Sequence, residues 1–178
     1  REEPWLRDHV IFDTALLPGT GIVEIIMSAA RNLGSATIDS LNLAAPLVLD
    51  DTVGVQLQLS VEPPNDRGLR AVTLHSRLED APEGTLWDEH ALAMLSGEPL
   101  PDTSRCPELA IWPPEEADAV ELEGFYTKLQ EHGFTYGDTF RGLTRAWYRG
   151  QSAFGHIVLP DSAATHVAGY GIHPALLD

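Results

Sequence analysis

Cysteine and positive charge are what this sequence of 178 residues has least of. The single cysteine, Cys106, excludes an internal disulfide, a cysteine-rich zinc site and a CxxC redox motif. Only 11 Lys and Arg oppose 27 Asp and Glu, and the formal net charge of -16 argues against binding to nucleic acid or to an anionic membrane surface. No apolar run reaches transmembrane length, because Pro, Asp or Glu interrupts each one. We therefore expect no nucleic-acid or membrane partner, and the lack of disulfides fits a reducing cytoplasm.

Signatures of metal, nucleotide and hydrolase chemistry are also missing. The sequence has no HExxH and no Walker loop, and the GTG at residues 19–21 lacks the third glycine of a dinucleotide-binding motif. A GxSxG nucleophile elbow is absent too, so nothing marks a hydrolytic site of that type. We expect no metal, nucleotide or redox cofactor.

The residues that are present fit an α+β fold. Apolar residues at helical spacing predict a largely buried helix over 19–34, and a shorter amphipathic helix begins at Leu122. Alternating patterns and turn residues predict extended segments, which are residues 38–49, 53–61, 69–78, 86–96, 139–148 and 152–159, the last two around a turn at Gly150. The final IHPALLD is expected to begin another buried helix.

This order of elements predicts two similar units. Residues 1–99 form the first unit, residues 100–116 are rich in Pro and acid and read as a linker, and residues 117–178 start the second. The natural architecture is two α+β units, each with an antiparallel sheet packed on a central helix. Since the sequence starts at Arg1 and stops at Asp178 in what reads as mid-element, we expect it to be a piece of a longer protein.

Three segments carry residues suited to chemistry. The first, HVIFDTALLPG, runs from His9 to Gly19 and places a histidine before the buried helix and a proline at its entrance. The second is GFTYGDTFRGL at 133–143, and the third is HPALLD at 173–178. Their order and spacing resemble the dehydratase domain of modular type I polyketide synthases, a double hotdog fold. The resemblance spans essentially the whole chain and implies that the second hotdog is incomplete.

Residue by residue, the family's HxxxGxxxxP motif matches His9 to Pro18, its YGP segment matches Tyr136 to Asp138, and its HPxLLD context ends at Asp178. The resemblance implies that His9 is a base and Asp178 an acid in the removal of water from a 3-hydroxyacyl thioester. Histidine suits the first task because its pKa lies near neutrality, and an aspartic acid suits the second when burial keeps it protonated.

The same resemblance assigns supporting residues and partners. Tyr136 would orient the acid or the leaving hydroxyl, and the residues expected to contact substrate are Pro18, Gly19, Gly137 and Phe140. A backbone N–H, or the N-terminus of the buried helix, would bind the thioester oxygen. Substrate would arrive on the phosphopantetheine arm of an acyl carrier protein, beside neighbouring synthase domains, and the domain is expected to be a homodimer.

Two positions depart from the family's motifs and leave alternatives open. Asp13 stands at the motif glycine and Asp138 at the proline of YGP. A carboxylate beside His9 would favour the imidazolium and leave less free base. A dehydratase-cyclase that closes a ring by oxa-Michael addition, an isomerase, and an inactive scaffold or carrier-docking hotdog therefore remain alternatives.

The remaining histidines are expected to be structural or solvated. They are His75, His90 and His156 within strands, His132 and His166 in surface loops, and His173 at a helix entry. The tryptophans are expected to pack in the core rather than to stack on substrate.

Overall fold

The computed structural model describes residues 3–34, 37–49, 52–98, 110–164 and 167–178. Cys106, His166 and the linker residues 100–109 lie outside these ranges. The strands are β1 (His9–Ile11), β2 (Thr14–Ala15), β3 (Thr37–Leu43), β4 (Val55–Val61), β5 (Arg70–Leu78), β6 (Asp88–Ser96), β7 (Asp118–Val120), β8 (Phe134–Tyr136), β9 (Leu143–Arg149) and β10 (Ser152–Ile157). The α-helices are α1 (Gly19–Asn32), α2 (Phe125–Glu131) and α3 (Asp161–Ala164), and the 3-10 helices are η1 (Pro4–Asp8), η3 (Asp138–Phe140), η4 (Val167–Gly169) and η5 (Pro174–Leu176).

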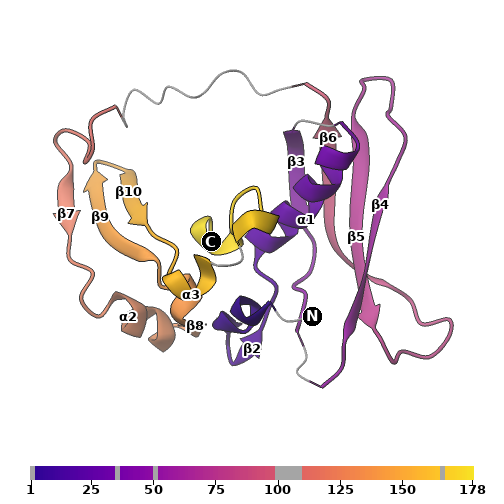
Figure 1. Ribbon diagram of the computed structural model, residues 1–178, viewed down its shortest axis with the longest axis horizontal. Coiled ribbons are helices and arrows are strands. Elements are labelled where there is room, and N and C mark those ends of the chain that lie inside the picture. Colours follow the sequence, from indigo (N-terminus) through magenta and orange to yellow (C-terminus); the bar gives the residue numbers. More distant parts are fainter. Residues whose placement is uncertain (1–2, 35–36, 50–51, 99–109, 165–166) are drawn as a thin grey trace.

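Helix α1 crosses a four-stranded antiparallel sheet of order β3-β6-β5-β4 (Figure 1). Ile22, Ile26 and Ala30 repeat every four residues and share one face of α1, which is why that face is buried. They pack on the inward-facing residues of the two central strands, which are Val72, Leu74, Ala91, Ala93 and Leu95. The predicted helix and the strands predicted at 53–61, 69–78 and 86–96 are confirmed, each end lying within two residues of its predicted position.

Strand β3 is an edge strand of this sheet, and its register shifts between Ile38 and Ser40. The extended segment predicted at 38–49 therefore divides into β3 and a following segment, residues 44–49, that leaves the sheet. Pro46 lies in this second part, where a missing backbone N–H removes no hydrogen bond from the ladder.

A second antiparallel sheet has the order β10-β9-β7 and lies at the other end of the molecule from β4 (Figure 1). Its central hairpin turns at Gly150, whose φ of 59° is in the left-handed region that glycine adopts without a Cβ penalty. The predicted turn is confirmed. The strand predicted at 139–148 is wrong at its start, because residues 138–140 form η3 and the strand begins at Leu143.

A small third sheet, β2-β1-β8, joins the two predicted units. β1 pairs with β8, so that His9 lies opposite Tyr136, 127 positions later in the chain. The division into 1–99, 100–116 and 117–178 stays a prediction. In the described residues, strand β1 of the first range pairs with strand β8 of the last, so strand pairing crosses this division.

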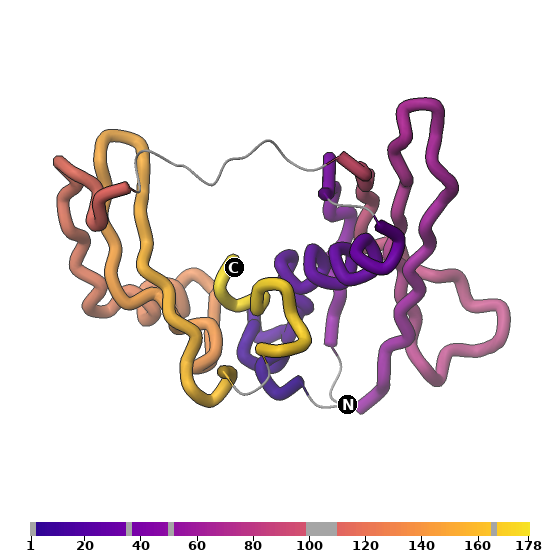
Figure 2. The backbone as a smooth tube through the Cα atoms, turned by 45° about the horizontal axis from the view of Figure 1, so that its top comes forward, coloured from indigo at the N-terminus to yellow at the C-terminus, as the bar shows by residue number. Residues whose placement is uncertain are grey.

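The C-terminal segment, residues 167–178, lies along α1 in both views (Figures 1 and 2). Where the sequence was expected to begin another buried helix, it forms the single 3-10 turn η5. His173 is its N-cap and accepts a hydrogen bond from the backbone N–H of Ala175 at 3.2 Å. The expectation of a helix-entry histidine is confirmed. None of the helices in the described part of the chain is both long and apolar enough to cross a membrane.

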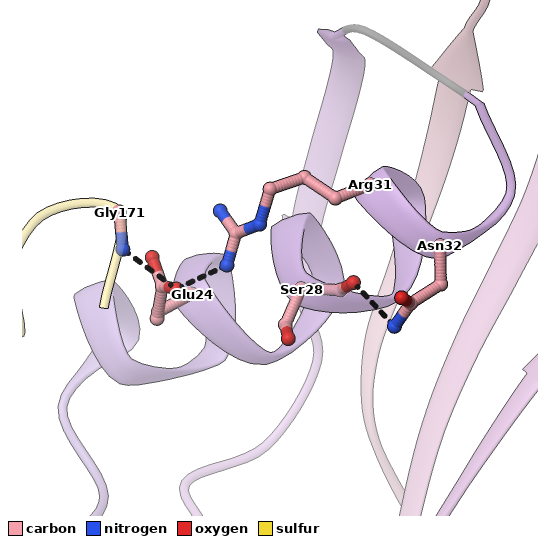
Figure 3. Close-up of polar contacts among 5 residues, drawn as sticks. All are labelled: Glu24, Ser28, Arg31, Asn32 and Gly171. Atoms are coloured by element: carbon pink, nitrogen blue, oxygen red, sulfur yellow. Dashed lines mark hydrogen bonds and ion pairs between the residues drawn. The ribbon is translucent and has the colours of Figure 1, made fainter. Parts of the chain in front are cut away.

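Two sets of contacts hold this segment in place. The backbone N–H of Gly171 donates to Glu24 of α1 at 3.1 Å, and Arg31 donates to the same carboxylate at 2.7 Å (Figure 3). Trp5 of η1 packs edge-on against His173, and its indole N–H donates to the hydroxyl of Tyr170 at 3.1 Å. The segment that ends in Asp178 is therefore fixed against the first unit.

Candidate active site

His9 is the first residue of β1 and is buried, with 5% of its surface exposed. Its ring Nδ1 lies 3.0 Å from the carbonyl oxygen of Leu16, across the β1–β2 hairpin. A carbonyl can only accept a hydrogen bond, so Nδ1 carries the proton in the neutral ring and Nε2 keeps its lone pair. In this arrangement the lone pair of Nε2 is available to accept a proton.

The carboxyl group of Asp178 faces Nε2 of His9. Its Oδ2 lies 3.6 Å from Nε2 of His9, and its side chain is 16% exposed. At 3.6 Å the two atoms are close without forming a direct hydrogen bond. The structure thus brings together the two residues that the motifs singled out, although they lie 169 positions apart in the sequence.

Aromatic rings surround the pair. Tyr136 stacks on His9 with ring centroids 5.6 Å apart, and Phe140 approaches the same ring at 5.2 Å. Burial raises the pKa of Tyr136 to about 12, with further contributions from the negative charge of Asp178 and from a hydrogen bond between the two side chains. Tyr136 therefore stays protonated at physiological pH and can donate to the carboxylate.

An apolar cavity of about 290 Å³ opens beside Asp178. It is lined by Tyr136, Phe140, Ala175 and Asp178, and on its other side by residues of α2 and of the β9–β10 sheet, which are Phe125, Tyr126, Leu129, Leu143 and Ile157. Such a lining can hold a short acyl chain with a few polar groups at one end. Sequence reasoning did not assign α2 to the site. The apolar face of residues 122–129 was the pattern that could have indicated it.

The other residues expected at the site occupy different places. Pro18 is buried as the N-cap of α1, where its carbonyl accepts the N–H of Gly21, and Gly19 begins the helix with Leu43 packed close to it. Gly137 lies between β8 and η3, where a Cβ would overlap the Asp8 carboxylate. Among the residues expected to contact substrate, Phe140 lines the cavity beside Asp178, whereas Pro18, Gly19 and Gly137 do not.

Asp13 lies away from His9. It is exposed at the tip of the β1–β2 hairpin with a φ of 60°, next to Phe12 with a φ of 47°. His9 is at the opposite end of that hairpin, about 10 Å away at the rise of a strand. The expectation of a carboxylate beside His9 was therefore assigned to the wrong residue, since Asp178 is the carboxylate that faces it.

Asp138 is the first residue of η3 and is exposed. The N–H of the first helical position makes no hydrogen bond within the helix, so proline is accepted there. An acidic side chain is favoured at the same position because it interacts well with the positive end of the helix dipole. Aspartate in place of proline is thus compatible with the same local structure.

His75, His90 and His156 lie within strands, as expected. His132 is exposed at the end of α2, whereas His90 is buried and bonded to Ser76. Among the tryptophans, Trp5 and Trp147 are buried as expected, but Trp112 is 40% exposed. In the described part of the chain, no group of three or more His, Cys, Asp or Glu side chains could hold a metal ion.

A buried helix packs on an antiparallel sheet, and a histidine and an aspartate from opposite ends of the chain meet at 3.6 Å. The sequence matches the family "Polyketide synthase dehydratase domain" over residues 1–77 and "Polyketide synthase dehydratase N-terminal domain" over residues 105–178. The chain belongs to the dehydratase domains of modular polyketide synthases, and its fold is part of a double hotdog.

Individual relatives agree with this family. The chain is 42% identical over 175 residues to polyketide synthase GfsE of Streptomyces halstedii, covering 98% of this chain and 5% of that protein. It is 40% identical to the solved dehydratase domain from the terminal module of the rifamycin polyketide synthase, with a TM-score of 0.91 and coverage of 98% and 64%. A bifunctional dehydratase-cyclase domain of ambruticin biosynthesis is 34% identical, with a TM-score of 0.86 and coverage of 98% and 60%. The chain thus spans less than two thirds of the solved domains that it matches.

Proposed function

We propose that this domain removes water from a 3-hydroxyacyl thioester to give the enoyl thioester during polyketide synthesis. The observation that carries the proposal is the orientation of His9, whose Nε2 lone pair faces the carboxyl group of Asp178 at 3.6 Å. The α-carbon and the hydroxyl-bearing β-carbon of the substrate are bonded neighbours, so a base and an acid that serve them must lie within a few ångströms of each other.

In the proposed reaction, Nε2 of His9 takes the proton from the α-carbon and Asp178, protonated, gives its proton to the hydroxyl on the β-carbon. The C–O bond breaks, the electron pair of the C–H bond becomes the double bond, and water leaves. His9 then carries one proton more and Asp178 one fewer, and a proton transfer between these neighbours restores both. Elimination of this kind is redox-neutral and requires no cofactor.

The surroundings support this chemistry. The N-terminus of α1 follows the β1–β2 hairpin directly, and backbone N–H groups there can bind the thioester oxygen as negative charge develops on it. The hydroxyl of Tyr136, whose pKa burial raises to about 12, can bond to Asp178 and hold it in position. The 290 Å³ cavity beside Asp178 gives the acyl chain an apolar place.

We further propose that the substrate is carried on the phosphopantetheine arm of an acyl carrier protein. Tethering supplies a roughly millimolar effective concentration with linkers of suitable length, so an acidic surface does not have to attract the carrier. In this proposal the domain works in the cytoplasm as a homodimer, next to other domains of the same synthase, as in the far longer relatives that it matches.

Product analysis of the full-length dehydratase domain with a carrier-bound 3-hydroxyacyl substrate tests the proposal. His9→Ala and Asp178→Asn should each lower kcat about 10²- to 10⁴-fold, the usual contribution of a general acid or base. His132→Ala is the matched control, because His132 is exposed at the end of α2 and should leave kcat unchanged. Undiminished turnover in His9→Ala would overturn the assignment of the base, and no turnover by the wild-type domain would favour the inactive scaffold.

A dehydratase-cyclase is the second candidate, favoured by the similarity to the ambruticin dehydratase-cyclase domain. It would use the same His9 and Asp178, and a second hydroxyl on the chain would then add to the new double bond. A synthetic substrate with such a distal hydroxyl separates the two, because a cyclase yields a cyclic ether and a simple dehydratase stops at the enoyl thioester. A shifted double bond would instead indicate an isomerase.

A further inference from the structure

A second buried histidine lies in the four-stranded sheet and has no part in the proposed reaction. His90 of β6 is 5% exposed, and its Nε2 lies 2.7 Å from the hydroxyl of Ser76 on the neighbouring strand β5, itself 7% exposed. The pair has the spacing of a nucleophile and its base, but a substrate carbonyl has no access to side chains this deeply buried. The structural role of His90 therefore depends on the backbone groups to which it hydrogen-bonds.

His90 holds the segment that follows β3. Its ring Nδ1 lies 3.1 Å from the carbonyl of Ala45, and its own backbone carbonyl accepts the N–H of Ala44 at 2.9 Å. Because a carbonyl accepts, Nδ1 donates and Nε2 accepts the Ser76 hydroxyl proton. Ser76 therefore fixes the ring in the tautomer and orientation that bind Ala45.

A stiff link continues from Ala45. Pro46 fixes its own φ and restricts the preceding residue to extended conformations, so the position of the Ala45 carbonyl limits where Leu47 can lie. Leu47 is 2% exposed, and its carbonyl accepts the N–H of Leu17 at 2.9 Å.

The segment then pairs with the end of β2, the strand that follows β1 in the hairpin. Val48 bridges Leu16, and the N–H of Leu49 donates to the carbonyl of Ala15 at 2.9 Å. Leu16 is the residue whose carbonyl binds Nδ1 of His9. A continuous series of bonded groups thus leads from His90 through Ala45 and Leu47 to the carbonyl that sets the tautomer of the base.

We propose that His90, oriented by Ser76, is a positioning residue for His9, acting through residues 44–49 on the Leu16 carbonyl. This inference rests on the proposed function, in which His9 Nε2 is the base. It predicts that loss of the His90–Ala45 bond changes the tautomer of His9 and lowers kcat, while substrate binding is largely kept.

Two isosteric variants of His90 in the full-length dehydratase domain test this. The side-chain nitrogen of asparagine can replace Nδ1, so His90→Asn keeps a donor for Ala45 and loses Ser76. Glutamine reaches the position of Nε2 instead, so His90→Gln keeps Ser76 and loses Ala45. We expect His90→Gln to lower kcat about 10- to 100-fold with KM within about twofold, as for a base displaced by a fraction of an ångström to 1 Å. His90→Asn should stay within about threefold of wild type.

The tautomer of His9 gives a readout that a merely structural role would not change. In nitrogen-15 NMR of labelled histidine, His90→Gln should reduce the Nδ1–H form of His9 and His90→Asn should preserve it. Pro46→Gly, at an exposed position, should loosen the link without touching His90 and should lower kcat in the same way. Equal kcat and an unchanged His9 signal in folded His90→Gln or Pro46→Gly would overturn the proposal.

The two proposals fail differently. If His9→Ala retains full activity, the function assigned to His9 is wrong, yet the NMR signal still reports whether His90 sets its tautomer. If His9→Ala is inactive and His90→Gln keeps wild-type kcat, the function stands and the positioning role is wrong.

Discussion

At the scale of single residues, His9 owes its proposed reactivity to one backbone carbonyl. The bond from Nδ1 to Leu16 leaves Nε2 unprotonated in the neutral ring, and the stacked ring of Tyr136 restricts its rotation. The motif made His9 a candidate from the sequence. Which of its nitrogens acts as the base could not be predicted, because that depends on a carbonyl seven positions away across a hairpin.

Asp13 gives a prediction at this scale. Its φ of 60° lies in the left-handed region, which costs an L-residue roughly 1–2 kcal/mol, somewhat less for Asp, and costs glycine nothing. Asp13→Gly should therefore stabilise the domain by up to about 1 kcal/mol, since the greater freedom of glycine in the unfolded chain offsets part of the gain. Denaturant unfolding measures the difference.

Asp13→Val is the matched comparison, because a β-branched side chain is the least tolerated at positive φ and should destabilise. Both variants should retain wild-type kcat, as Asp13 lies at the opposite end of the hairpin from His9. A marked change of kcat in Asp13→Gly with unchanged stability would mean that Asp13 does act on the base.

At the scale of elements, length decided what the sequence could predict. Helix α1 and strands β4, β5 and β6 have seven or more residues, enough to show a period, and all four were predicted. Strands β1, β2 and β8 have two or three residues and show none. These short strands build the site, so the elements that matter most for function were the least predictable.

Glu24 is the contact at which α1 holds the C-terminal segment. Burial alone would raise the pKa of Glu24, but hydrogen bonds from Arg31 and from the N–H of Gly171 outweigh it and hold the pKa below its ordinary value. A lowered pKa stabilises the fold above the ordinary value of 4.5, and this contribution is lost as the pH falls through the folded-state pKa.

Glu24→Gln should therefore be less stable than wild type at neutral pH, and the difference should shrink as the pH falls below the ordinary value of 4.5. Urea unfolding at several pH values measures it. Arg31→Gln removes the same ion pair from the other side, so the two substitutions should be less than additive in the double variant. A difference that persists unchanged in acid would show that packing rather than charge accounts for the effect of Glu24.

At the scale of the whole molecule, the proposed site exists only where the two parts of the chain meet. β1 pairs with β8, and residues 167–178 lie against α1, so the base comes from one end of the sequence and the acid from the other. Gly137 lies at this junction, where its N–H donates to the carbonyl of Asp8 at 2.8 Å. Asp8 in turn accepts the N–H of Thr139 at 3.0 Å.

Gly137→Ala should disrupt this junction, because the added Cβ would overlap the Asp8 carboxylate. We expect a loss of about 1–3 kcal/mol, typical of overpacking, and a lower kcat, since β8 carries Tyr136 against His9. Gly97→Ala is the control, because nothing lies within 4 Å of a Cβ there. Equal stability and activity of the two variants would show that the junction tolerates a shift of β8.

The sequence by itself determined the fold class, the long elements and the family, and it singled out His9 and Asp178 as candidates, because these depend on local periodicity and on short motifs. Only the tertiary structure decided that Asp178 rather than Asp13 faces His9, that α2 lines the cavity, and which nitrogen of His9 is free. Each of these depends on atoms brought together by packing and by backbone hydrogen bonds between distant segments. Periodicity along the chain carries no information on such contacts.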